Sequence, residues 1–280
     1  MLKHIRRKLS QARYLVKEKA ELSKVLPIPC DTSKLLEFSQ LNLEHIFYSE
    51  EIDQEWEDVE TELSLFLSNT NKKGGTNPGD RRAIYYLVRF FCPVSVLEIG
   101  THIGSSSVHI AAAVRSLQIK APYSSFSFDT VDIYNVNDKI SKPWVIFGSI
   151  LSPADIVNKL GCDDFVSFIT EDSSNYLSQC DKKYDFIFLD GSHSASSVYR
   201  ELPASLKLLN KGGCILLHDY FPGLRPLWSN GKIIPGPYLA VRRLRKEGIK
   251  INVLPLGRLP WKTKLNSSVS SLALLHKDFL

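Results

Sequence analysis

From Val94 onward, short apolar runs alternate with segments of helical period. Each run has the length of a single strand, and strands that alternate with helices are typical of a parallel sheet covered on both faces. The predicted strands are Val94–Glu98, Ser127–Ile133, Phe165–Thr170, Tyr184–Asp190 and Cys214–Asp219. Two later runs, 251–256 and 269–276, predict an antiparallel pair. The sequence therefore predicts an α/β fold, a doubly wound and mostly parallel sheet of seven strands.

Helical patterns dominate the chain before this region. Residues 1–24 carry apolar side chains at three- and four-residue steps, which predicts an amphipathic helix. These side chains are Leu2, Ile5, Leu9, Ala12 and Val16. Further helices are predicted from Leu35, over 53–67 and over 83–91, with a turn-rich linker at 69–79. We accordingly expect a helical N-terminal extension, residues 1–73, followed by a main domain, residues 74–280.

One segment between predicted strands stays open. Residues 135–161 are long for a connection and contain the apolar run Trp144–Phe147. This run has two interpretations, an extra strand at the edge of the sheet or a lid.

Composition limits the protein class. The chain has 280 residues, of which 44% are hydrophobic, enough for a substantial core. We see no apolar stretch of the roughly 20 residues that cross a bilayer and no signal-peptide pattern, so a cytoplasmic location is expected. The cysteines, Cys30, Cys92, Cys162, Cys180 and Cys214, are dispersed, which suggests neither a zinc site nor a disulfide framework.

Positive charge is concentrated at the N-terminus. Residues 1–24 hold eight Lys or Arg and two Glu, a net charge of +6, whereas the whole chain has a formal charge of +5. The remainder is thus −1, which argues against a nucleic-acid partner. For the basic helix three interpretations remain: packing on the main domain or on a second copy in a homo-oligomer, a solvated face, or contact with an anionic membrane surface.

The first predicted strand leads into a glycine-rich turn. In VLEIGTHIGSSS, residues 96–107, the strand delivers Glu98, the turn contains Gly100 and Gly104, and an Ala-rich helix follows. Glycine permits a tight turn and close approach of a ligand, and the helix N-terminus offers unpaired N–H groups. This arrangement predicts a nucleotide or cofactor cradle. The NAD fingerprint is not met, because His102 occupies the position of its second glycine.

Three motifs carry a family resemblance. They are Glu98–Ser106, which fits E-x-G-x-x-x-G-x-S, and the strand ends Asp190-Gly191-Ser192-His193 and His218-Asp219-Tyr220. The chain resembles class I S-adenosylmethionine (SAM) dependent methyltransferases over about 74–276. It is similar to the catechol- and caffeoyl-CoA-type O-methyltransferases and, more specifically, to the methyltransferase family 24 group.

The resemblance implies SAM as cofactor and a set of binding residues. Motif I would contribute Glu98, Gly100, Thr101, Gly104, Ser105 and Ser106. Asp132, at the end of the second strand, would accept the ribose hydroxyls, with Asp129 as a rival. Asp172 and Ser173 would lie at the adenine, and Asp190 near the cofactor. In these families the segment before the first strand borders the pocket, so Gly75 and Thr76 are candidates, although a plain linker is the favoured interpretation.

The ends of the fourth and fifth predicted strands bring two acids and two histidines together. Because these strands should be neighbours, Asp190, His193, His218 and Asp219 should converge on one pocket, and we take Asp190, His193 and His218 as catalytic candidates. Two mechanisms stay open. Asp190 and Asp219 match two ligands of the Mg²⁺ or other divalent cation that catechol-type enzymes use, but Tyr220 replaces the expected Asn. Alternatively, His193 takes the acceptor proton without a metal.

The expected function is SAM-dependent O-methylation of a hydroxyl on a small molecule or sugar. Two alternatives keep the same fold. The first is a metal-dependent hydroxylase, since relatives of this group include proteins assigned to hydroxylation. The second is a catalytically silent protein that binds a partner through its N-terminal helices.

Overall fold

The computed structural model describes residues 2–67 and 75–277. A seven-stranded sheet has the order β3-β2-β1-β4-β5-β7-β6, with β1 to β5 parallel and β7 antiparallel to both its neighbours. The strands are β1 Ser95–Ile99, β2 Ser127–Asp132, β3 Val166–Thr170, β4 Tyr184–Leu189, β5 Leu209–Leu217, β6 Asn252–Pro255 and β7 Ala273–His276. The predicted α/β fold, mostly parallel with an antiparallel pair at one end, is confirmed.

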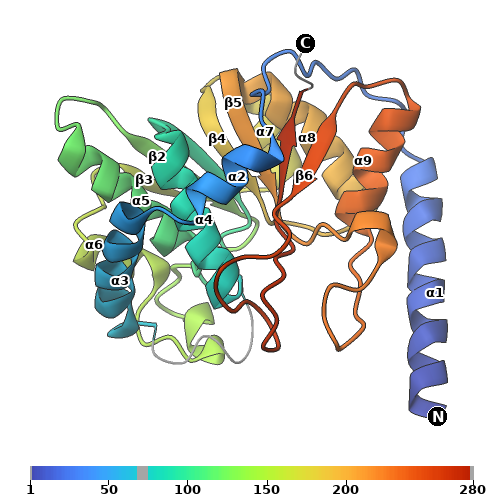
Figure 1. The fold of residues 1–280 in the computed structure, drawn as a ribbon, viewed down its shortest axis with the longest axis horizontal. Coiled ribbons are helices and arrows are strands. Elements are labelled where there is room, and N and C mark those ends of the chain that lie inside the picture. The colour runs from blue at the N-terminus through green and yellow to red at the C-terminus, as the bar shows by residue number, and fades with distance from the viewer. Residues whose placement is uncertain (1, 68–74, 278–280) are drawn as a thin grey trace.

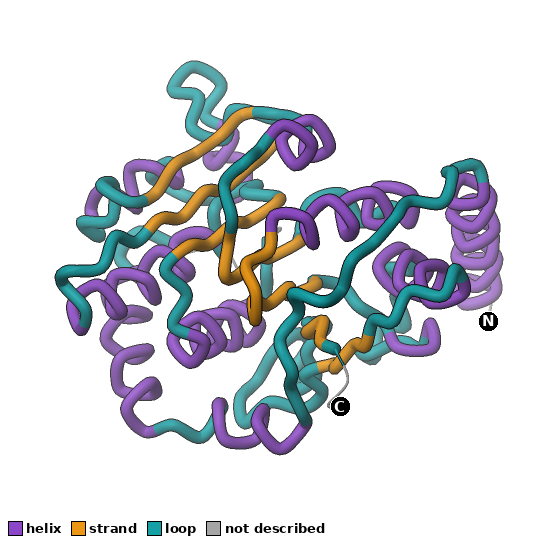
Figure 2. Tube along the Cα trace, turned by 90° about the horizontal axis from the view of Figure 1, so that it is seen from above, coloured by secondary structure: helices purple, strands orange, loops and turns teal. Residues whose placement is uncertain are grey.

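Helices cover both faces of the sheet (Figures 1 and 2). One layer consists of α2 Gln40–Ile46, α3 Glu50–Ser64, α4 Pro78–Phe91, α5 Ser107–Lys120 and α6 Pro153–Lys159. The other consists of α1 Leu2–Ser23, α7 Ser173–Gln179, α8 Ala195–Leu208 and α9 Gly236–Lys246. Short 3-10 helices lie at η2 Pro143–Phe147 and η3 Pro222–Leu224.

Alternation along the strands builds the two halves of the core. In β4, Phe186 and Phe188 pack toward α4 and α5, whereas Ile187 and Leu189 pack toward α8 and α9. All four side chains are buried. A strand that is apolar on both faces is what a central parallel strand requires, and it places the C-terminal ends of β1, β4 and β5 side by side at one edge of the sheet.

The predicted helix from Leu35 is wrong at its start. Leu35 forms an isolated bridge with Gly213, and Glu37 forms one with Lys277. The Leu36 N–H donates to the Gly213 carbonyl over 2.9 Å. Backbone pairing with the sheet thus replaces the local helical pattern, and α2 begins only at Gln40.

The segment around Trp144 forms neither a strand nor a lid over the pocket. It is the 3-10 helix η2, which begins at Pro143 and ends at Phe147, and Gly148 follows with a φ of 86°. Trp144 is buried, and its ring lies 5.4 Å from the Lys139 Nζ. Proline at the first helical position and a left-handed glycine after the last favour this short helix over an edge strand.

Helix α1 packs on α8 and α9 through a different face from the predicted stripe. Glu18 and Leu22 are buried, and Leu15 packs against the same core. By contrast Leu9 is 56% and Val16 67% exposed. The apolar side chains that define the helical pattern in this part of α1 therefore face solvent.

The predicted domain division lies outside the described residues, as does most of the predicted linker, 69–79. Helices α2 and α3 contribute Leu43, Trp56 and Leu63 to the same core as α4 and α5. A separate extension over 1–73 stays a prediction. In the described part of the chain no helix is both long and apolar enough to span a membrane.

Candidate active site

A pocket of about 980 Å³ opens at the C-terminal ends of β1, β2, β4 and β5. This is the edge at which open α/β sheets bind ligands. Among the predicted cofactor residues, those that line the pocket are Gly100, Thr101, Ser105, Ser106, Asp132, Asp172, Ser173 and Asp190. The catalytic candidates His193 and His218 and the metal candidate Asp219 line it as well.

Gly100 is required at the start of the motif I turn. Its φ is +101°, in the region that favours glycine, and a Cβ there would lie 2.3 Å from the Asp190 carbonyl oxygen. The Gly100 N–H donates to the Val131 carbonyl over 2.8 Å. The turn from β1 is thereby held directly against the end of β4, where the catalytic candidates begin.

Glu98 and Gly104 support the turn from behind and do not line the pocket. Glu98 is fully buried and accepts hydrogen bonds from the hydroxyls of Ser106 over 2.5 Å, Thr130 over 2.6 Å and Ser107. Gly104 faces Pro153 of α6. Three hydroxyls hold the strand-end carboxylate inward, away from the pocket, and the cofactor role of Glu98 and Gly104 stays a prediction.

Burial raises the pKa of Glu98 to about 7, against the effect of its three hydroxyl donors. An acid whose pKa is raised on folding favours the folded state below its unfolded pKa and loses that contribution as pH rises through the folded pKa. We therefore expect the unfolding free energy of the wild type, relative to Glu98→Gln, to fall by on the order of 3 kcal/mol between about pH 4.5 and 7.5. Urea unfolding across this range measures it.

The exposed Glu57→Gln in α3 controls for the loss of one carboxylate. If the difference in unfolding free energy between the wild type and Glu98→Gln does not change with pH, the raised pKa of Glu98 is contradicted.

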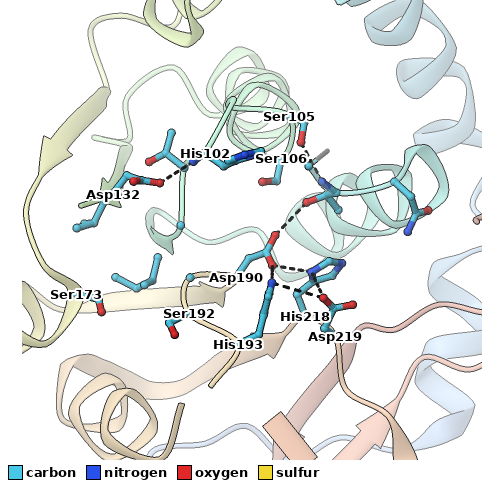
Figure 3. Close-up of a pocket in the computed structure, with 18 of the residues that line it drawn as sticks. His102, Ser105, Ser106, Asp132, Ser173, Asp190, Ser192, His193, His218 and Asp219 are labelled. Carbon is cyan, nitrogen blue, oxygen red and sulfur yellow. Dashed lines mark hydrogen bonds and ion pairs between the residues drawn. The ribbon is translucent and has the colours of Figure 1, made fainter. Parts of the chain in front are cut away.

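Asp132 lies across the pocket from the histidines (Figure 3). Its Oδ2 accepts the His102 N–H over 2.8 Å, and its Oδ1 accepts the Tyr134 N–H over 3.0 Å. The rival Asp129 is buried elsewhere, where Lys182 Nζ and the Tyr184 hydroxyl donate to it over 2.6 and 2.7 Å. Asp132 is thus the carboxylate of β2 that borders the pocket.

The β3 end contributes the third wall. Asp172 caps α7 by accepting the N–H groups of Ser174 and Asn175. The Ser173 hydroxyl donates over 2.7 Å to Glu201, whose pKa burial raises to about 7.

Asp190, His193, His218 and Asp219 converge as the sequence predicts (Figure 3). His218 Nδ1 lies 2.6 Å from Asp190 Oδ1. His193 Nε2 lies 3.5 Å from Asp219 Oδ2 and 3.8 Å from Asp190 Oδ1. His193 is about one third exposed toward the pocket, whereas the His218 side chain is nearly covered. Tyr220 turns away into the core, beside Tyr238.

The two histidines differ in burial and in their neighbours. Burial alone would lower the pKa of His218, but the charges of Asp190 and Asp219 and hydrogen bonds to Asp190 and Asp80 outweigh it and raise this pKa well above its usual value. His218 is therefore an imidazolium at neutral pH, held among three carboxylates. The more exposed His193 is the one that faces the pocket.

Two contributors to the site, Asp80 and Trp228, escaped the sequence analysis, and a third, Thr76, was considered there but not favoured. Asp80 is fully buried in the first turn of α4, 3.7 Å from His218 Nε2, and its position matches an ordinary helix-start acid. Thr76 donates its hydroxyl to Asp190 Oδ2 over 3.2 Å, so the plain-linker interpretation is wrong for residues 75 and 76, which line the pocket. Trp228 arrives from a distant loop, for which no local pattern exists.

Segments remote in sequence hold His193 in place. Glu18 of α1 accepts the Ala195 N–H over 2.6 Å, and Gly236 at the start of α9 lies so close to the His193 carbonyl that a Cβ would clash. Helix α1 therefore helps to support the His193 segment.

The donor set is compatible with a divalent ion. Asp190, His193 and His218 each offer a ligand atom within 4.8 Å of the others. Two imidazoles with a carboxylate suit a borderline ion such as Fe²⁺ or Zn²⁺ better than Mg²⁺.

Residues 97–220 match a family model described as a methyltransferase domain, family 24. The structure is similar to the SAM complex of the O-methyltransferase TomG from Streptomyces achromogenes, with a TM-score of 0.52, 15% identity and coverage of 82% of this chain and 91% of that chain. The chain has the SAM-dependent O-methyltransferase fold.

Two further structures agree with this fold. An O-methyltransferase from Bacillus cereus in complex with S-adenosylhomocysteine (SAH) gives a TM-score of 0.53 at 15% identity, covering 85% of this chain and 96% of that one. A Staphylococcus aureus protein assigned as a caffeoyl-CoA O-methyltransferase gives 0.51 at 17% identity, covering 85% and 99%. Comparison with curated proteins finds no match. The resemblance predicted from motif I and the strand ends is confirmed.

Proposed function

We propose that the protein transfers the methyl group of SAM to a hydroxyl of a small molecule or sugar. The observation that carries this proposal is the position of His193, which reaches the same pocket as the motif I turn and is flanked there by Asp190 and Asp219. A cofactor cradle and a general base thus share one cavity within a methyltransferase fold.

The cofactor would lie along the strand ends. Gly100 and Ser105 of the motif I turn would face the methionine portion, Asp132 would accept the ribose hydroxyls, and the Asp172–Ser173 turn would border the adenine. The order of these groups from β1 to β3 follows the order of the strands, so one extended ligand can contact all of them.

His193 is assigned the proton transfer. The acceptor oxygen attacks the methyl carbon as the bond from this carbon to the sulfonium sulfur breaks, and SAH leaves with the electron pair. The hydroxyl proton passes to His193 Nε2, where Asp219 and Asp190 stabilise the resulting imidazolium. Because the sulfonium is already a good leaving group, positioning and deprotonation are what the enzyme supplies.

His218 is assigned an electrostatic role. As an imidazolium it offsets the negative charge of Asp80, Asp190 and Asp219, three carboxylates that could not be buried together without a cation.

A divalent ion, if bound, would be held by Asp190, His193 and His218, with Asp219 adjacent. It would lower the pKa of the acceptor hydroxyl. The hydrogen bond between His218 and Asp190 favours the metal-free arrangement, because the imidazolium and a metal ion compete for the same carboxylate.

Methyl-labelled SAM tests the proposal. Incubation with a panel of catechols, other phenols and sugars, followed by mass spectrometry, should give a product heavier by about 14 mass units with unlabelled SAM and by about 17 with trideuteromethyl SAM. A gain of about 16 units without label would indicate hydroxylation instead. SAM binding with no product from any acceptor that binds the pocket would favour the silent scaffold.

A further inference from the structure

The outer face of α1 is apolar but is not covered by any of the residues that the structure describes. Leu9, Ala12 and Val16 follow one another at helical spacing, and all three are exposed, Leu9 by 56% and Val16 by 67%. The helix docks through a different side, where Glu18 and Leu22 are buried. Figure 1 shows α1 at the edge of the molecule, with nothing beyond it.

Cations flank this outer face on both sides. Arg13 lies four residues after Leu9 and three before Val16, and Lys17 continues the same row. On the other side Lys19, three residues after Val16, lines a groove of about 520 Å³ together with Arg242 and Lys246 of α9. All five of these side chains are exposed. The apolar stripe therefore lies within a cationic surface that continues from α1 onto α9.

The charge of the helix decides what it fits. Residues 1–24 carry a net charge of +6, and one of their two acids, Glu18, is already committed to the Ala195 N–H. Pairing with the same face of a second copy would bring two such cationic surfaces together. An anionic bilayer provides both requirements, since apolar side chains enter the headgroup region while Lys and Arg remain at the phosphates.

We propose that the outer face of α1, formed by Leu9, Ala12 and Val16 and flanked by Arg13, Lys17 and Lys19, docks the protein on an anionic phospholipid surface. Glu18, on the buried side of α1, accepts the Ala195 N–H and so supports the His193 segment. Docking through the outer face would leave this hydrogen bond in place. The inference does not depend on the methyl-transfer reaction.

Vesicle sedimentation of the full chain tests the proposal. We expect the protein to pellet with phosphatidylcholine vesicles that contain phosphatidylglycerol, to stay in solution with phosphatidylcholine alone, and to be released by high salt. Leu9→Asp/Val16→Asp should weaken partitioning by about tenfold or more, because it removes the apolar contact and adds negative charge. Thermal unfolding confirms that the variant folds.

The matched control is Ile119→Asp/Ile140→Asp, which makes the same chemical change at side chains that are 73% and 93% exposed away from α1. It should pellet nearly as the wild type does. Equal loss in both double variants, equal binding to both kinds of vesicle, or no binding by the wild type would overturn the proposal. So would a concentration-dependent dimer, seen by equilibrium centrifugation without vesicles, that only the α1 variant dissociates.

Discussion

Replacing His193 with alanine should lower kcat by about 10²- to 10⁴-fold, the usual contribution of a general base, while the Kd for SAM stays nearly constant. The reason is geometric: His193 faces the pocket with its Nε2 3.5 Å from Asp219, whereas the buried His218 is bound to Asp190. Single-turnover rates with saturating SAM and an acceptor from the labelled-methyl assay measure the effect.

His45→Ala, at an exposed histidine of α2, is the matched control and should leave the rate unchanged. A chelator distinguishes proton transfer to His193 from activation of the acceptor by a divalent ion. Turnover that survives the chelator but not His193→Ala agrees with the base assignment. If the chelator abolishes turnover and His193→Ala has no larger effect than the loss of one metal ligand, the result would contradict the base assignment. Activation of the acceptor hydroxyl would then be assigned to a metal at Asp190 and its neighbours.

Asp132→Ala should weaken SAM binding by about 10- to 150-fold, which corresponds to about 1.5 to 3 kcal/mol for a lost charged hydrogen-bond acceptor. Asp132 is the only carboxylate of β2 that borders the pocket, and it also orders the turn through the His102 N–H. Asp132→Asn keeps one acceptor oxygen, so its affinity for SAM should lie between those of the wild type and Asp132→Ala. Isothermal titration calorimetry gives the affinities.

The exposed Asp164→Ala controls for the loss of one negative charge and should bind SAM as the wild type does. If Asp132→Ala retains the wild-type affinity for SAM, the ribose does not contact Asp132. The cofactor would then have another orientation in the pocket.

The fold was predictable because its determinants are local. Runs such as Tyr184–Asp190 are apolar on both faces and end abruptly in a polar residue, so strand type, burial and the site edge all follow from one short segment. The convergence of Asp190, His193, His218 and Asp219 followed from a single topological assumption, that β4 and β5 are neighbours, which the sheet confirms.

The rest depended on tertiary contacts that no local pattern encodes. Leu35 has helical spacing, but pairing with Gly213 draws it into an extended conformation. Glu98 ends its strand like a ligand contact, yet three hydroxyls satisfy it inside the fold. Asp80 resembles an ordinary N-terminal helix acid until His218 is placed beside it. The deciding partners of Leu35 and Asp80 are distant in sequence, as is Thr130 among the three donors to Glu98.

Calorimetric titration of the wild-type protein with SAM, SAH and NAD tests the central claim most directly. SAM and SAH should bind in the low micromolar range, about −8 kcal/mol, with Asp132 and the motif I turn as the principal contacts. NAD should give no binding heat, because His102 occupies the position at which its fingerprint requires glycine. Tight binding of NAD with no response to SAM or SAH would contradict the assignment of this pocket to methyl transfer.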